Sequence, residues 1–430
     1  MTGASPRTPR AGLILALGAM SALGPLSLDM YLPALPALAD DLGASDAVGQ
    51  LTMSACLIGL ALGQIVIGPL SDRFGRRRPL LIGLGAYTLL SVLCALAPSA
   101  ALLVALRALQ GFAGAAGIVL ARAVVRDSYR GREVARHLAL LIVVSSIAPL
   151  AAPLLGGQLL KLMDWRGVFV VLAGIGVALT VLAAFAVRES LPGEDRHGGG
   201  LGAMTAGFGR VLREPLFTAS TIGLALSGAA IFTYISASPF VLQGPYGLTD
   251  EQFSFVFAAN SAGVASLGYV NAALVRRVHP RVLLLCGSSA AALGSLCCLA
   301  AVLVGAGLWP MLAGLFVTVA SGAFFNPNAT ALGLSLHARD AGTASAVIGT
   351  GPFLVGSAIA PLALAGGASA ATMAALIAAL MVLAWLVALV FVRPLSRRAH
   401  ELSGVSASEE SAAPADPVVP LPLNPAPDRP

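Results

Sequence analysis

A short basic segment, GPLSDRFGRRRP at residues 68–79, separates two long apolar runs of this chain. Four of its twelve residues are arginine and one is aspartate. Gly75 permits a tight reversal of the backbone, and arginines collect in the short loops on the cytoplasmic side of a membrane. The segment therefore predicts a turn between two membrane-spanning helices.

The composition indicates a polytopic membrane protein. Hydrophobic residues make up 57% of the 430 residues, charged residues only 11%, and the mean hydropathy is +0.87, far from the values of a soluble domain. The net charge of +6 does not indicate a nucleic-acid partner, because the basic residues lie in short loops between apolar runs. The five cysteines lie in apolar runs without the spacing of metal ligands or disulfides, so we expect neither.

Twelve apolar segments are long enough to cross a bilayer, which takes about 20 mainly apolar residues. We therefore expect an all-α membrane protein with twelve transmembrane helices. The first segment lacks a convincing cleavage pattern and is followed by eleven others, so we expect it to be retained. The segments are 11–35, 47–70, 79–98, 101–122, 137–160, 167–187, 215–240, 252–275, 281–304, 307–333, 341–365 and 369–392.

The distribution of arginine predicts the orientation. An even number of spans places both termini on one side, and the positive-inside rule makes the arginine-rich side cytoplasmic. The opposite side holds only Lys161 and Arg166 as basic residues. The expected cytoplasmic side holds Arg7, Arg10, the arginines of 68–79 and of 126–136, Arg276, Arg277, Arg281, Arg393, Arg397 and Arg398.

Two six-helix halves are predicted, at residues 1–187 and 215–393. The segment 188–214 contains three consecutive glycines, and we expect a flexible cytoplasmic linker there. The tail, residues 394–430, is rich in proline, alanine and serine and cannot bury a core, so we expect it to be disordered.

The two halves share a short sequence motif at equivalent positions. The sequence IAPLA occurs at 147–151 in the fifth predicted span and again at 359–363 in the eleventh, and each copy is followed by a pair of glycines. Two related halves with a site between them form a transporter architecture.

The segment 68–79 resembles the cytoplasmic loop motif of the major facilitator superfamily. In that motif Gly68 would allow close helix packing, and Asp72 would face the start of the eleventh span near residues 342–343. Such a contact can hold one conformation and break in the other. The alternative is a loop that only sets topology. The resemblance implies gating roles for Gly68, Asp72, Arg73, Gly75 and Arg76.

Longer stretches narrow the family. SLDMYLPALP at 27–36, RALQG at 107–111, YISASPF at 234–240, PNA at 327–329 and GTASA at 342–346 look like the bicyclomycin-resistance (Bcr/CflA) branch of drug:proton antiporters. The resemblance covers all twelve spans and stops at the tail. It implies a multi-pass protein of the bacterial inner membrane that expels small, mostly hydrophobic, drug-like compounds while protons enter.

Other functions remain as alternatives to export. The nearest is a proton-coupled uptake symporter for a small metabolite, and a non-transporting membrane receptor is the alternative from another class. An enzyme is not expected, because the spans contain no deep histidine, no paired carboxylates and no phosphate-binding loop. We expect no cofactor and no metal, and we expect a monomer in the lipid bilayer.

Asp29 and Arg107 are opposite charges deep within apolar spans, where a charge is costly and marks a functional site. Each lies about six residues from the expected outer end of its helix, so their depths match at about 1.5 Å per residue. An apolar environment favours the protonated form of a carboxyl group, and a nearby guanidinium favours the ionised form. We predict that Asp29 carries the proton and that Arg107 controls its ionisation. The alternative is a permanent structural ion pair.

The fifth span carries Pro149, Pro153, Gly156 and Gly157. It resembles the antiporter motif of the superfamily, with alanine where that motif has glycine before each proline. Prolines remove helix hydrogen bonds and glycines allow close approach, so we predict a bend or gate. Packing without a gating role is the alternative, since both residues are common in membrane helices.

Several polar residues are candidates for the walls of a central substrate cavity, although contacts between helices are an equally good explanation for each alone. They are Tyr31, Gln110, Tyr234, Asn260, Asn271 and Asn328.

Overall fold

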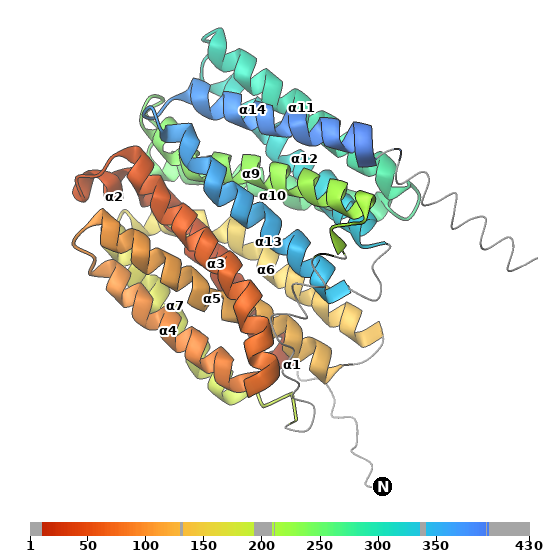
Figure 1. Cartoon of the computed structure of the whole chain (residues 1–430). Helices are drawn as coiled ribbons and strands as arrows, with labels where there is room; N and C mark the ends of the chain where they lie inside the picture. Colours follow the sequence, from red (N-terminus) through yellow and green to blue (C-terminus); the bar gives the residue numbers. More distant parts are fainter. Residues whose placement is uncertain are drawn as a thin grey trace, which may run out of the picture.

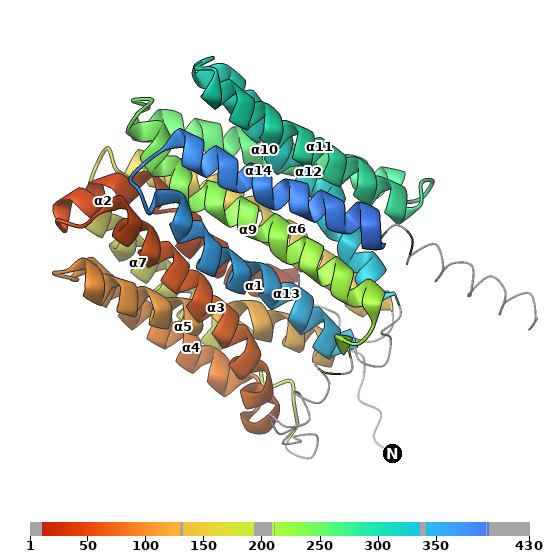
Figure 2. The ribbon, with the colours of Figure 1, turned by 45° about the horizontal axis from the view of Figure 1, so that its top comes forward.

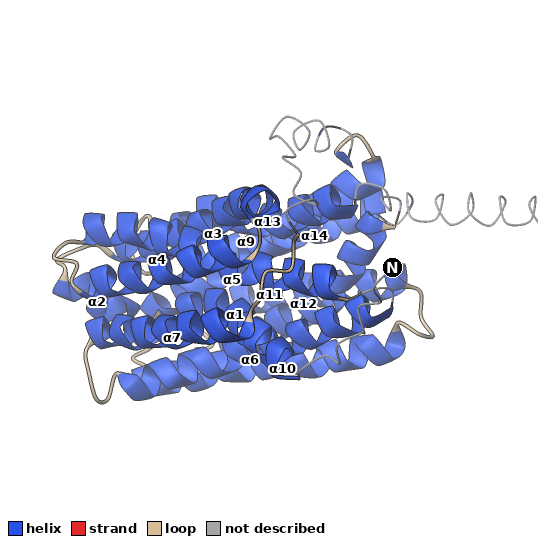
Figure 3. Cartoon of the chain, turned by 90° about the horizontal axis from the view of Figure 1, so that it is seen from below, coloured by secondary structure: helices blue, strands red, loops and turns tan. Residues whose placement is uncertain are grey.

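The computed structural model describes residues 11–129, 132–192, 211–335 and 341–392, with the isolated residues 209 and 394. Within these ranges the chain forms helices and no strand (Figure 3). The predicted tail lies outside the described residues apart from 394, and so does most of the predicted linker.

The first half contains six spans, as predicted. Its first span has three parts, a helix, a 3-10 turn and a short second helix. The elements are α1 Ala11–Asp29, η1 Leu32–Ala34, α2 Leu35–Asp41, α3 Asp46–Phe74, α4 Arg77–Ala95, α5 Ala100–Ser128, α6 Arg132–Leu159 and α7 Trp165–Ala186.

The second half also contains six spans. Its last two spans each end in a short non-α segment. The elements are α9 Pro215–Gln243, α10 Asp250–Leu274, α11 Pro280–Leu303, α12 Leu308–Leu334, α13 Ala341–Ile359, η3 Ala360–Leu364, α14 Ala370–Val387 and η4 Ala388–Val392. The described residues thus confirm an all-α polytopic fold.

Two spans end six residues later than predicted. The first span continues past residue 35 to Asp41, because Pro33 interrupts the α-helix only for the short turn η1 and α2 then resumes it. The fourth span runs to Ser128 rather than to residue 122. Its last turns carry exposed arginines, Arg122 and Arg126, which extend the helix beyond the apolar window used to predict it.

Glycines bring α3 and α5 into backbone contact. A Cβ on Gly59 would lie 1.9 Å from the carbonyl oxygen of Ala108, and a Cβ on Gly111 would lie 2.1 Å from that of Cys56. Gly68, predicted to provide such an approach, meets only a Val119 methyl at 3.9 Å. In this conformation the close approach of α3 and α5 lies at Gly59 and Gly111, and the packing role of Gly68 stays a prediction.

The two halves lie side by side, with α2 at one end of the bundle (Figures 1 and 2). Between the halves, α3 packs against α13 and α6 against α10. The second and fifth spans of each half therefore meet the fifth and second spans of the other half, which gives the interface an approximate two-fold relation.

Candidate functional site

The candidate proton site lies where α1 ends. Asp29 is the last residue of α1, and Met30 and Tyr31 form a turn before η1. Asp29 is only 6% exposed. The prolines of this region, Pro33 among them, prevent a regular continuation of the helix, so the α-helix stops directly after the carboxylate.

Arg107 of α5 is completely buried beside this turn. Its Nη2 donates to the carbonyl oxygen of Ser27 at 2.9 Å, and its Nη1 donates to Oε1 of Gln110 at 2.5 Å. The guanidinium therefore contacts α1 two residues before Asp29. Its hydrogen-bond partners are neutral.

Two aromatic rings cover the guanidinium. The Arg107 Cζ atom lies 4.3 Å from the ring centroid of Tyr31 and 5.5 Å from that of Phe169. Both rings offer the electron-rich faces that stabilise a cation. The Nε of Arg107 has no hydrogen-bond partner among the described residues, so one donor of the buried cation is left available.

A second layer of hydrogen bonds fixes the partners of Arg107. Gln110 donates from Nε2 to Oγ of Ser91 at 2.7 Å, and the hydroxyls of Ser27 and Tyr87 share a hydrogen bond of 2.6 Å. These bonds tie α1, α4 and α5 together around the cation. We call Ser27, Tyr31, Arg107, Gln110 and Phe169 the arginine cluster.

Asp29 and Arg107 are not paired in this conformation, although the guanidinium contacts the backbone of α1 two residues before Asp29. The ion pairs of the described residues join Arg76 to Asp72 and Asp127, Lys161 to Glu251, and Arg166 to Asp41. Asp29 is therefore a buried carboxyl group without a counter-charge, and Arg107 is a buried cation held by neutral groups. The proton-coupling role of both residues stays a prediction.

The polar groups of the second half form neutral pairs. Asn260 donates from Nδ2 to the hydroxyl of Tyr234 at 2.6 Å, and Asn328 donates to Oδ1 of Asn271 at 2.8 Å. All four side chains are buried. They connect α9 with α10 and α10 with α12.

The residues predicted for the cavity walls separate into two groups. Tyr31 and Gln110 belong to the arginine cluster and are fully buried. Tyr234, Asn260 and Asn328 lie in the neutral pairs of the other half. Each already has a polar or ring partner, so a contact with substrate would require the side chain to rearrange. Their role as substrate contacts stays a prediction.

The loop motif forms a charge cluster at the end of the first half opposite α2. Arg76 is 8% exposed and donates to Asp72 at 2.5 Å and to Asp127 at 2.8 Å. Glu189 accepts from the backbone N–H of Arg76 at 2.7 Å and caps the start of α4. Sequence reasoning missed Asp127 and Glu189. Asp127 could have been identified from the sequence, because it is an acidic residue next to Arg126 at the end of a span.

The other residues of the loop motif each have a different environment. Gly75 has a φ of +89°, which confirms the tight reversal expected of it. Arg73 is exposed and lies over the ring of Phe74, at 5.3 Å from its centroid. The described partner of Asp72 is Arg76. Residues 342–343, the predicted contact of Asp72, begin α13, but their side chains lie outside the described set.

Hydrogen bonds join the halves toward the α2 end. Gln50 of α3 is fully buried and donates from Nε2 to Oγ of Ser236 at 2.6 Å and to the carbonyl oxygen of Ala360 at 2.7 Å. Gln243 donates to the carbonyl oxygen of Pro33 at 3.0 Å. These bonds hold α3 and η1 of the first half against α9 and η3 of the second, so this end of the bundle is closed.

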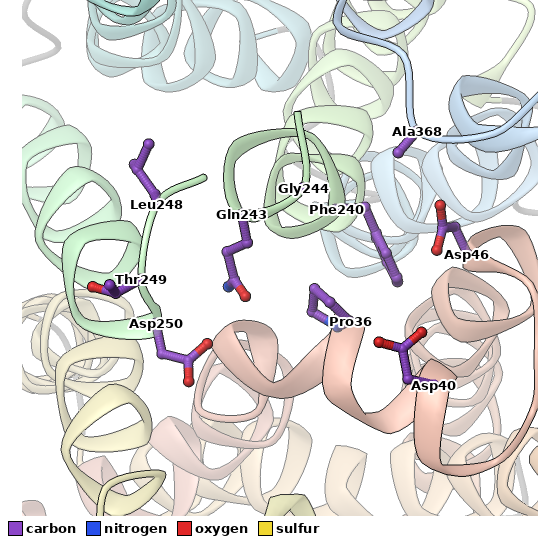
Figure 4. Close-up of a pocket in the computed structure, with 10 residues that line it drawn as sticks. All are labelled: Pro36, Asp40, Asp46, Phe240, Gln243, Gly244, Leu248, Thr249, Asp250 and Ala368. Atoms are coloured by element: carbon purple, nitrogen blue, oxygen red, sulfur yellow. The ribbon is translucent and has the colours of Figure 1, made fainter. Parts of the chain in front are cut away.

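A shallow pocket remains at the surface of the closed end (Figure 4). Residues from both halves line it, and Asp40 and Asp46 from the first half face the same space as Asp250 and Gln243 from the second. The pocket lies outside the bundle contacts formed by Gln50, and it does not include Asp29 or the arginine cluster.

The prolines and glycines of α6 give this helix contacts with both halves. Because Pro153 has no N–H, the carbonyl of Pro149 lacks its usual donor one turn later, and Ser261 of α10 donates to it at 3.2 Å. Gly156 lies against Met30 of the α1 turn, and Gly157 lies against Ser254 of α10. The gating role predicted for these residues stays a prediction.

Sequence comparison identifies a family and its relatives. Residues 17–361 match the family model described as Major Facilitator Superfamily. A Bacillus subtilis (strain 168) protein described as "Uncharacterized MFS-type transporter YdgK" is 37% identical over 82% of this chain and 88% of its own length. A "Bicyclomycin resistance protein homolog" of Haemophilus influenzae is 30% identical over 80% and 86%. A Klebsiella pneumoniae "Multidrug resistance protein MdtL" is 30% identical over 62% and 67%.

Solved structures share the fold at low sequence identity. A D-xylose-proton symporter superposes with a TM-score of 0.69 at 15% identity, covering 87% of this chain and 96% of the other. An inward-facing bacterial homolog of the human lysosomal transporter Spinster gives 0.62 at 19% identity, covering 92% and 96%. These likenesses show the arrangement of helices and carry no information on substrate.

Proposed function

The chain belongs to the major facilitator superfamily, and from this premise we propose that it exports small hydrophobic compounds across the bacterial inner membrane in exchange for protons. Transport by a multi-pass membrane protein follows from the family. The direction, the proton and the drug-like substrate are the proposal. The relatives whose names refer to bicyclomycin and multidrug resistance support it.

The single observation that carries the proposal is the buried carboxyl group of Asp29, which has no ion-pair partner among the described residues. A carboxylate in an apolar bundle is costly unless it is paired or protonated. Arg107 already has neutral partners and one free Nε donor. Asp29 can therefore exist protonated in the present conformation and move to Arg107 when it ionises.

Alternating access links this exchange to transport. With the arginine-rich side placed in the cytoplasm, the closed α2 end faces the periplasm, and the substrate site would be loaded from the cytoplasm. Substrate binding would accompany loss of the proton from Asp29 to the cytoplasm. Opening of the α2 end would then release the substrate and let Asp29 take a proton from the periplasm, so that one proton enters per turnover.

Everted membrane vesicles with an acidic interior test the direction of coupling. The probes are radiolabelled bicyclomycin and chloramphenicol, both small and uncharged enough to suit a site with one carboxyl group. Antiport predicts that a probe accumulates inside the vesicles while protons leave. Movement of the probe outward with the protons would establish the symporter, and no gradient-dependent movement of either probe would contradict the proposal for these compounds.

Asp29→Asn tests the proton carrier. We expect it to abolish accumulation driven by the pH gradient, because the amide cannot bind and release a proton, while the protein still inserts in the membrane. Asp40→Asn is the matched control, since Asp40 is an exposed carboxylate of the same half. Full accumulation by Asp29→Asn would rule out its assigned role.

A further inference from the structure

The turn after Asp29 rests directly on α6. A Cβ placed on Gly156 would lie 1.9 Å from the carbonyl oxygen of Met30 and 3.0 Å from its carbonyl carbon. Real Cβ atoms do not approach backbone so closely, so only glycine fits at position 156 without a shift of the chain. The contact is with backbone, which cannot turn away as a flexible side chain can.

Met30 lies between the two residues that define the candidate proton site. Asp29 precedes it, and Tyr31 follows it with its ring over Arg107 at 4.3 Å from the guanidinium carbon. The carbonyl that Gly156 touches therefore belongs to the peptide that joins Met30 to Tyr31. A displacement of this peptide would change the position of Asp29 relative to the arginine cluster.

The next residue of α6 contacts the other half of the molecule. A Cβ on Gly157 would lie 2.3 Å from Oγ of Ser254, in the first turns of α10. Ser254 is itself fixed by donating to the carbonyl oxygen of Asp250 at 2.7 Å. Consecutive glycines thus place one rigid helix against the α1 turn on one side and against α10 on the other.

We propose that Gly156 is a positioning residue for Asp29, and that the pair Gly156–Gly157 transmits the separation of α6 from α10 to the Asp29–Arg107 geometry. This inference rests on the proposed role of Asp29 as proton carrier. When the α2 end opens, α10 moves away from α6 and its contact with Gly157 is lost. α6 can then shift. Because Gly156 contacts the α1 turn, the turn shifts with α6 and moves Asp29 relative to Arg107.

The equivalent glycines of the second half have no such contacts. Gly366 and Gly367 follow the second copy of the IAPLA motif, and a Cβ on either would meet nothing within 4 Å. The role of the pair therefore belongs to the α6 copy and its surroundings. Gly366 has no left-handed backbone angle, whereas Gly367 has a φ of +94°, so Gly366→Ala is a matched control.

The test measures protonation of Asp29 without any transported compound. The full chain is placed in lipid nanodiscs, and infrared difference spectra are recorded across pH. The protonated-carboxyl band lost in Asp29→Asn reports Asp29. We expect Gly156→Ala to change its proton affinity by at least threefold, about half a pH unit in the midpoint, and Gly366→Ala to leave the midpoint unchanged.

A second pair of variants tests transmission between the halves. Gly157→Ala should also move the midpoint, because its methyl group displaces α10 through Ser254. Adding Ser254→Ala removes the clashing hydroxyl and should return the midpoint toward that of the wild type. The atom nearest to a Cβ at position 157 is a side-chain oxygen, and the backbone oxygen of Asp250 is farther away at 3.2 Å, so these variants remain informative if Gly156→Ala fails to fold.

The outcomes separate this inference from the proposed function. Absence of any carboxyl band specific to Asp29 would contradict the proton carrier itself. A band with the same midpoint in wild type and in folded Gly156→Ala would overturn the positioning role and leave the carrier intact. A midpoint moved by Gly156→Ala but not by Gly157→Ala would overturn transmission.

Discussion

The two halves share their topology but bury different polar groups. The first half encloses a carboxyl group and a guanidinium, Asp29 and Arg107, whereas the second half encloses neutral pairs formed by Tyr234 with Asn260 and by Asn328 with Asn271. A buried charge must be compensated whenever it changes state, but a neutral pair need not be. In the proposed mechanism the first half therefore handles the proton, and substitutions in the neutral pairs of the second half should not disturb it.

Among the polar groups that distinguish the two halves, a change in the arginine cluster should have the largest effect on transport. Arg107→Lys keeps the charge, but the ammonium cannot reach Ser27 and Gln110 together or stack between Tyr31 and Phe169 as the planar guanidinium does. We expect proton-driven transport to fall about a hundredfold, a loss typical of a misplaced functional group. Transport into everted vesicles measures it.

Arg126→Lys is the control for Arg107→Lys. Arg126 lies on the same helix but is exposed, and we expect the substitution to leave transport unchanged. If Arg107→Lys transported at the rate of the wild type, the cluster would need only a positive charge. The contrast between a charged and a neutral half would then no longer depend on the geometry of a guanidinium.

The fold was predictable because the bilayer imposes a length on every span. Hydropathy located all twelve spans, and it erred where charged or interrupted ends continue a helix, as at Asp41 and Ser128. The repeated sequence IAPLA shows that local sequence alone does not determine the backbone conformation. Residues 147–151 stay within α6, whereas 359–363 pass from α13 into the 3-10 segment η3. Packing around each copy decides its form.

The site was predictable in its residues but not in its contacts. Asp29 and Arg107 stand out because charges are rare in spans. Their separation into an unpaired acid and a cation with neutral partners depends on where Gln110 and the Ser27 carbonyl lie. The role of Gln50 was missed for the same reason, since a single glutamine near a helix start gives no sign of a partner about 200 residues or more away.

A substitution in the neutral pairs should have a smaller effect and tests whether the second half takes no part in proton handling. Tyr234→Phe leaves the buried amide of Asn260 without its acceptor, which costs about 1–3 kcal/mol of stability. We expect a lower unfolding temperature and an unchanged pH dependence of transport. A double variant, Tyr234→Phe with Asn260→Leu, removes both partners and should regain most of that stability. A changed pH dependence would show that the second half also takes part in proton handling.

Gln50 joins the two halves and should give the smallest change in stability. Gln50→Leu removes two donated hydrogen bonds, each worth about 1 kcal/mol, and also removes the cost of the buried Oε1 that has no partner. On balance we expect the free energy of unfolding to fall by about 1 kcal/mol. The equilibrium between the closed and open conformations shifts by a similar amount, because the two hydrogen bonds and the burial of Oε1 exist only when the α2 end is closed.

Ser238→Cys provides a reporter for that equilibrium. Ser238 of α9 is fully buried near the closed end, and its hydroxyl has no described partner, so the substitution breaks no hydrogen bond. We expect a membrane-impermeant maleimide to label it about fivefold faster when Gln50→Leu is added, the effect of about 1 kcal/mol on the population that is open. Equal labelling rates with and without Gln50→Leu would mean that the hydrogen bonds of Gln50 are not needed to keep the α2 end closed. The closed end would then depend on apolar packing and on the other contacts between the halves, such as the hydrogen bond from Gln243 to the carbonyl oxygen of Pro33.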